Sequence, residues 1–242
     1  KAVVEARHRV EVVVLPKADE SSHYGDVERT SLHPNEYIFN WKENAEPLSR
    51  AIKANKVLAA MAKATLDPAQ QAAYDQLWKL TADDIGAQAA LQLLVMEGTL
   101  TTMSSGEPPA TLLQELTQLA DQGFALAPGL DRTALVCDLM QEIAFPSSIS
   151  QRNKGTCSVT TAQILLTQTR PAEYARIVRS LAAEAGEPVT LAGGGQWQRE
   201  PDTETNDKSH RTESSRLFQA AAMEGTWPHA DYDNTLDKHS FE

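Results

Sequence analysis

The sequence has few cysteines, few aromatic residues and no long apolar run. Two cysteines in 242 residues cannot form a disulfide scaffold, and no CxxC or HExxH spacing indicates a zinc site. No stretch approaches the ~18 consecutive apolar residues of a membrane helix, and no signal-peptide pattern opens the chain. We therefore expect no membrane span and no metal or other cofactor.

Positive charge is also scarce. The chain has 22 lysines and arginines against 33 acidic residues, which gives a formal net charge of −11 at pH 7. The basic residues are scattered, whereas a nucleic-acid-binding surface requires a basic patch or stripe. Nucleic acid is therefore not an expected partner. The hydrophobic fraction of 41% is that of an ordinary globular protein long enough for one or two domains.

Apolar residues recur at helical spacing through most of the chain after Pro47. Helices are predicted within residues 47–65, 67–80, 82–98, 111–124, 131–146, 170–186 and 213–225, with a further helix beginning near Cys157. Strands are predicted around residues 10–14 and 37–41 and in a hairpin within 187–200. The pattern indicates a helix-rich α+β protein. A polar loop at 101–110 divides it into a mainly helical region, 1–105, with a short leading strand, and a domain over 106–242.

The stretch SQRNKGTCSVTTAQILL, residues 150–166, carries the strongest functional signal. A polar loop ends at Cys157, where a helix is predicted to begin, and the positive end of a helix stabilises a thiolate. Gly155 allows a tight turn and leaves space in front of the sulfur. The backbone N–H of Cys157 and the side-chain amide of Gln151 are candidate donors to an oxyanion. The other thiol, Cys137, lies within a helical pattern and is expected to be packed and inert.

The segment from Gln151 to Cys157 resembles the active-site segment of papain-like cysteine peptidases, in a divergent bacterial form. In that superfamily a glutamine six residues before the cysteine supplies an oxyanion donor, and the cysteine opens the central helix. Bacteriocin-processing peptidases share this spacing. The chain departs from plant and animal papains, because it lacks their second cysteine beside the nucleophile and the aromatic residue after it. The resemblance implies a papain-like helix-plus-strands domain over 106–242, in which Cys157 is the nucleophile.

The resemblance also requires a histidine after the cysteine. Three histidines are available there, namely His210, His229 and His239. We prefer His239, which lies in DKHSFE with Phe241 at the alternating position of a strand. Asp233 or Asp237 could orient its ring. The chain begins at Lys1 without a methionine and is interpreted as a piece of a longer or processed protein, so a histidine beyond Glu242 is the alternative.

These residues predict a thiol enzyme that cleaves amides through a thioester, as a peptidase, amidase, deamidase or transglutaminase. Its partner would be a protein or peptide substrate. If the protein is a bacterial effector or toxin, an immunity or chaperone protein would cover the site. The alternative is a non-catalytic interaction scaffold in which Cys157 is structural, since free cysteine is often buried. Two unpaired cysteines do not decide the location of the protein, since they are compatible with the bacterial cytoplasm and with secretion.

Overall fold

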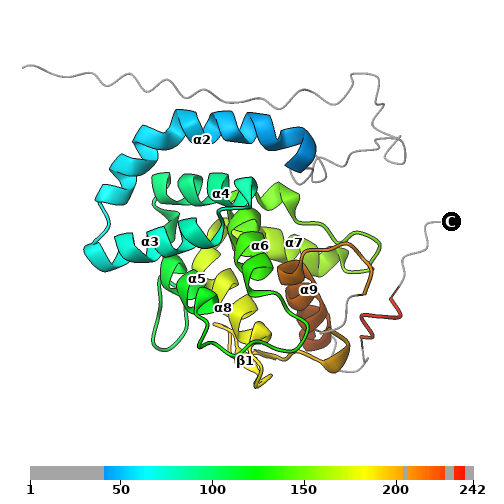
Figure 1. Ribbon diagram of the computed structural model, residues 1–242. Helices are drawn as coiled ribbons and strands as arrows, with labels where there is room; N and C mark the ends of the chain where they lie inside the picture. The colour runs from blue at the N-terminus through cyan, green and yellow to red at the C-terminus, as the bar shows by residue number, and fades with distance from the viewer. Residues whose placement is uncertain (1–40, 204–206, 227–231, 238–242) are drawn as a thin grey trace, which may run out of the picture.

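The computed structural model describes residues 41–203, 207–226 and 232–237 (Figure 1). The strand predicted at 10–14 lies outside these residues, as does most of the strand predicted at 37–41. Trp41, the last residue of that second segment, begins a helix instead. The helix predicted to begin at Pro47 therefore begins earlier, at Trp41.

Helices dominate the described residues, and a single two-stranded hairpin accompanies them. The α-helices are α2 (Trp41–Ala64), α3 (Pro68–Leu80), α4 (Ile85–Met96), α5 (Leu112–Ala120), α6 (Arg132–Ala144), α7 (Cys157–Thr169), α8 (Pro171–Ala182) and α9 (Glu213–Thr226). The strands are β1 (Val189–Thr190) and β2 (Gln196–Trp197), and short 3-10 turns occur at η1 (Thr99–Thr101), η2 (Pro146–Ser148) and η3 (Pro201–Thr203). The helix-rich α+β class predicted from the sequence is confirmed.

Side-chain caps fix several helix starts. The carboxylate of Asp67 accepts a hydrogen bond from the N–H of Gln70, and the side-chain oxygen of Gln70 accepts one from the N–H of Asp67. Asp84 caps α4 and Asp131 caps α6 in the same way, each through the N–H three residues later. Such caps satisfy N–H groups that have no partner within the helix. Each of these aspartates stands directly before its helix, the position at which such a side chain caps best.

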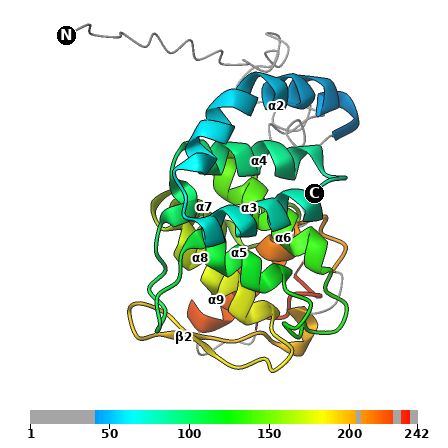
Figure 2. The same cartoon turned by 60° about the vertical axis from the view of Figure 1, so that its left-hand side comes forward.

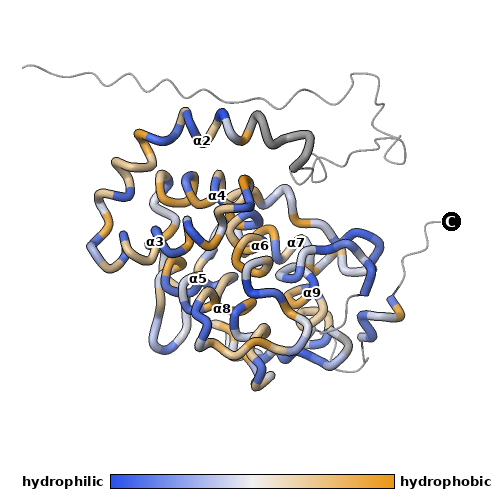
Figure 3. The backbone as a smooth tube through the Cα atoms, in the orientation of Figure 1, coloured by the Kyte–Doolittle hydropathy of each residue, from blue (hydrophilic) through white to orange (hydrophobic). Residues whose placement is uncertain are grey.

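One hydrophobic core joins the helices. It runs from Ala59 on α2 to Ala222 on α9 and includes fully buried leucines on α3, α4, α5 and α6. The core therefore draws on both sides of residue 105, and the division there into two domains stays a prediction. Helix α2 lies across α4 at the edge of the bundle (Figures 1 and 2). Hydrophobic and hydrophilic residues alternate along the helices (Figure 3), and Val57 and Met61 of α2 are largely exposed.

The hairpin packs at the other end of the molecule, against α8 and α9. It is antiparallel, with Val189 opposite Trp197, as the glycine-rich turn predicted. The Trp197 ring meets Phe218 of α9 edge to face at 5.1 Å between centroids. Within the described ranges this hairpin is the only sheet.

Candidate functional site

The two cysteines have opposite environments. Cys157 is exposed and is the first residue of α7, where the sequence placed it. Cys137 is 4% exposed in the core. Burial, together with the negative charge of Asp84, raises the pKa of the Cys137 thiol well above its usual range. A thiol reacts as its thiolate, so Cys137 is unsuited to nucleophilic chemistry and Cys157 is the accessible thiol.

No side chain of the described residues caps the start of α7. Thr156 occupies the capping position, but its hydroxyl turns inward and donates to Oε1 of Gln219 at 2.9 Å. The Thr156 hydroxyl therefore accepts no hydrogen bond from the N–H groups of the first turn, including that of Cys157. Uncapped N–H groups at a helix N-terminus favour bound or developing negative charge. Among the described residues, the backbone N–H of Cys157 thus has no partner and could donate to an oxyanion.

The loop leading to Cys157 is fastened by a distant segment, residues 232–237. Lys154, only 1% exposed, donates through Nζ to the backbone carbonyls of Asn234 at 2.5 Å and Asp237 at 2.7 Å. The N–H of Gly155 donates to the Asp237 carboxylate at 2.7 Å. The hydroxyl of Tyr232 donates to the same carboxylate oxygen at 2.9 Å. These contacts fix the backbone immediately before the thiol.

The two aspartates proposed to orient a histidine have other partners. Asp237 lies beside the loop before Cys157, but its carboxylate accepts from Gly155 and Tyr232. Asp233 accepts from the N–H groups of Thr235 and Leu236, within its own turn. The structure therefore brings Asp237 to the candidate site, where it positions the loop. Asp233 belongs to the same segment, but its carboxylate is held within its own turn.

Of the three candidate histidines, the structure describes only His210. Its side chain is exposed and lines a pocket of about 220 Å³ with Ser150 and Arg152, the two neighbours of Gln151. Cys157 is not among the residues that line this pocket. The carbonyl of Gln151 accepts from the N–H of Lys154 at 3.2 Å, and its side chain has no hydrogen-bond partner in the described part of the chain. His229 and His239 lie outside the described residues, so the choice of His239 stays a prediction.

A buried polar network that the sequence analysis did not predict leads to the loop before Cys157. It begins at Glu142 on α6. This side chain is 1% exposed, and its carboxylate accepts hydrogen bonds from four hydroxyl groups. The donors are Tyr174, Thr212, Ser214 and Ser215. Burial raises the pKa of Glu142, although the hydroxyl donors oppose that rise.

The network continues through two fully buried glutamines to the start of α7. Gln163 donates to the Tyr174 hydroxyl at 2.8 Å and to Ser215 at 2.9 Å. Gln219 donates to Oε1 of Gln163 at 2.9 Å and accepts from Thr156. Glu142 and the residue before Cys157 are therefore joined by consecutive hydrogen bonds. The sequence signal was a polar residue on an inward-facing helical position, since Gln163 lies four residues after buried Val159.

A second polar cluster surrounds Arg211, whose side chain is fully buried. It pairs with Asp207 and donates to Asn234 at 2.5 Å and to Gln219 at 3.1 Å. Burial alone would raise the pKa of Asp207, but hydrogen bonds from Ser209 and the charge of Arg211 lower it to about 2. This cluster connects the Glu142 network to the segment 232–237.

Acid should weaken this cluster in a defined pH range. Because the folded pKa of Asp207 lies below the ~3.9 of an unperturbed aspartate, its ionised form stabilises the fold. That contribution is complete above about pH 4 and is lost as the pH falls toward 2. We expect Asp207→Asn to flatten the acid limb of stability, measured by urea unfolding at each pH. An unchanged slope between pH 4 and 2 would contradict this role for Asp207, with the exposed Asp83→Asn as the control.

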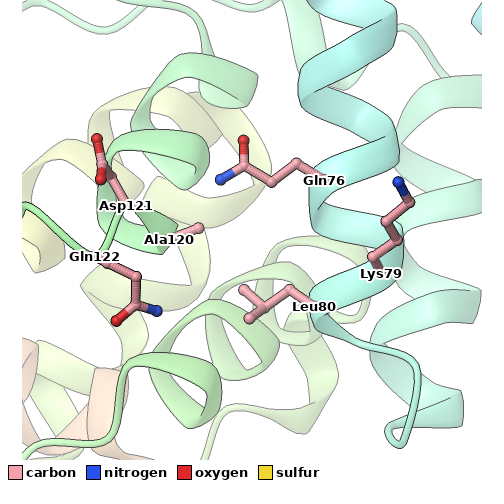
Figure 4. A pocket seen from close by; sticks show the side chains of 6 residues that line it. All are labelled: Gln76, Lys79, Leu80, Ala120, Asp121 and Gln122. Atoms are coloured by element: carbon pink, nitrogen blue, oxygen red, sulfur yellow. The ribbon is translucent and has the colours of Figure 1, made fainter.

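Two further pockets lie away from the thiol. One, of about 470 Å³, lies between α3 and the end of α5, where Gln76 and Leu80 face Ala120 and Gln122 (Figure 4). The other, of about 710 Å³, lies between α8 and the hairpin. Neither contains a histidine or a cysteine among its lining residues. Within the described residues no cluster of three histidine, cysteine or acidic side chains could hold a metal ion, and no helix is long and apolar enough to cross a membrane.

The described residues thus define a helix-rich α+β protein with an exposed thiol at an uncapped helix start. No family model matches the chain, and no curated protein or solved structure is significantly similar to it.

Proposed function

We propose that the protein is a papain-like thiol enzyme that cleaves or transfers amides through a thioester at Cys157. The observation that carries the proposal is the exposed thiol at an uncapped helix N-terminus. Its backbone N–H and the unpartnered amide of Gln151 suit an oxyanion, because donors held in place before reaction stabilise developing charge best. The anchoring of the preceding loop by Lys154 and Asp237 supports such pre-organisation.

In the proposed reaction, the Cys157 thiolate attacks the substrate carbonyl carbon, and the carbonyl electrons move onto oxygen. The N–H of Cys157 and the Gln151 amide would donate to that oxygen. Collapse expels the amine or ammonia, which takes its proton from a histidine, and leaves a thioester. Water then hydrolyses the thioester in a peptidase, amidase or deamidase, whereas an amine accepts the acyl group in a transglutaminase. We assign the proton-transfer role to His239, with His229 and His210 as the alternatives.

Selective alkylation tests this proposal. We expect iodoacetamide at pH 7 to modify Cys157 more than about tenfold faster than Cys137, followed by peptide mass spectrometry, since only an accessible thiolate reacts. Replacement of the working histidine by alanine should slow the labelling of Cys157. His239→Ala, His229→Ala and His210→Ala are therefore compared in parallel, with Cys157→Ser as the blank. Labelling of Cys157 no faster than that of free glutathione, and unchanged in all three variants, would leave the proposal without support.

The non-catalytic scaffold remains the second candidate, and one observation favours it. Val57, Leu58 and Met61 leave apolar surface on the outer part of α2, with exposed fractions of 68%, 44% and 64%. Exposed apolar patches are common at protein-binding surfaces. A scaffold needs no activated thiol, so slow labelling of Cys157 would favour this second function.

A further inference from the structure

The pocket beside Gln151 has the character of a small ligand site. Seven residues line it, from η2, the loop after it and the start of α9, namely Ser148, Ser150, Arg152, His210, Arg211, Thr212 and Ser215. Its volume of about 220 Å³ lies below the ~300–1,000 Å³ of pockets for drug-sized molecules. It therefore suits one compact chemical group rather than a whole cofactor.

The lining carries positive charge in a chain whose net charge is −11. Arg152, His210 and Arg211 are among the lining residues, and none of the seven is acidic. Arg211 is held in place by Asp207, Asn234 and Gln219. Of the four lining hydroxyl groups, those of Thr212 and Ser215 already donate to Glu142, which leaves those of Ser148 and Ser150 for an anion.

A buried hydroxyl in the wall has no partner. Ser148 is 5% exposed, and its Oγ makes no hydrogen bond within the described residues. An unpaired buried donor destabilises a fold, and such groups in native structures call for an explanation such as a missing ligand. An acceptor bound in the pocket would satisfy this hydroxyl.

The backbone of the wall is also unusual. Arg152 and His210 have φ values of 53° and 59°, in the left-handed region that residues other than glycine rarely adopt. Strained backbone of this kind concentrates at functional sites, where the surrounding structure maintains it. Two of the three basic residues that line the pocket are thus held in that conformation.

We propose that this pocket binds a compact oxyanion, a carboxylate or a phosphate group. Ser148 Oγ would donate a hydrogen bond to it, Arg152 would supply positive charge, and the His210 imidazole would donate through a ring N–H. The pocket is close to the candidate nucleophile, because the Ser150 carbonyl and the Thr156 hydroxyl bond the same side-chain amide of Gln219, at 3.4 and 2.9 Å. A ligand anchored here would lie next to the start of α7, but the binding itself does not require Cys157 to react.

Titration with two anions tests the proposal on the full chain. Inorganic phosphate and N-acetylglutamate are added at constant ionic strength and pH 6, and amide shifts are followed by NMR. We expect saturable shifts confined to residues around 148–152 and 210–212 for at least one of the anions. Saturation by phosphate alone identifies a phosphate ligand, and saturation by N-acetylglutamate alone identifies a carboxylate.

Three variants decide where the anion binds. Ser148→Ala and Arg152→Gln should each raise Kd about tenfold, the effect of one charge-assisted hydrogen bond. Lys79→Gln removes a positive charge in the pocket of Figure 4 and should leave Kd unchanged. Cys157→Ala should also retain binding, which separates this proposal from the thiol chemistry. Non-saturable shifts with both anions, or equal Kd in all variants, would overturn it.

Discussion

Glu142→Ala should destabilise the protein by about 3–5 kcal/mol, because it removes the acceptor for four buried hydroxyl groups. The four donors come from α8, from the start of α9 and from Thr212 before it, so no single rearrangement re-pairs them. Water has no ready access, since Tyr174 and Ser214 are fully buried. Urea unfolding of the variant against wild type measures the loss.

Glu142→Gln is the matched control and should cost about 1 kcal/mol or less. Its amide keeps an acceptor oxygen, and hydroxyl groups can rotate to accept from its N–H₂ group. The neutral side chain also avoids the cost of burying a charge, the cost that raises the pKa of Glu142. An equal loss in Glu142→Ala and Glu142→Gln would show that the hydroxyl cluster does not stabilise the fold in the way proposed.

The raised pKa of Glu142 also fixes the sign of a pH effect. Folding favours the neutral form of Glu142, because its pKa is higher in the folded than in the unfolded protein. The stabilisation of the fold by neutral Glu142 is therefore complete below the unfolded-state pKa and is lost as the pH rises through the folded-state pKa. Wild type should therefore lose stability relative to Glu142→Gln as the pH rises above the ~4.3 of an unperturbed glutamate. This trend is opposite to that of Asp207, which acts below pH 4. Pairing each residue with its amide variant separates the two.

Local chemistry in the sequence was sufficient to predict most helices. Asp67 and Asp131 cap the helices that follow them, and a helix begins at Cys157 as the change from polar loop to apolar period indicated. The hairpin around the glycines at 193–195 also forms. These signals are short-range, because a cap or a turn depends on residues within one or two turns of the chain. The start of α2 was placed too late, since no cap or apolar period marks the residues before Pro47.

The surroundings of the thiol could not be predicted in the same way. Thr156 and its partner Gln219 are separated by 63 residues, and Lys154 and its partner Asn234 by 80. Periodicity shows which face of a helix is buried, but not which distant polar group meets it there. A lysine in a hydrophilic loop such as QRNKGT is ordinarily exposed, so nothing local revealed that Lys154 is buried. Pairings of this range arise only from the packed fold.

Lys154→Met should therefore affect both stability and the thiol. The change leaves two backbone carbonyls, those of Asn234 and Asp237, without their buried donor, and we expect a loss of about 2–4 kcal/mol. Asp207, 4.0 Å from Nζ, also loses a neighbouring positive charge. Lys53→Met, on the exposed face of α2, is the matched control and should stay within about 0.5 kcal/mol of wild type.

The second readout of Lys154→Met is the reactivity of Cys157. If residues 232–237 hold the loop in its working geometry, releasing them should change the rate of Cys157 alkylation by several fold while the variant is still folded. Restoring a cation with Lys154→Arg should recover part of the stability, since guanidinium also donates to carbonyl oxygens. A variant that loses stability but alkylates at the wild-type rate would limit Lys154 to a structural role. A variant altered in both would connect the anchoring of this loop to the chemistry at the start of α7.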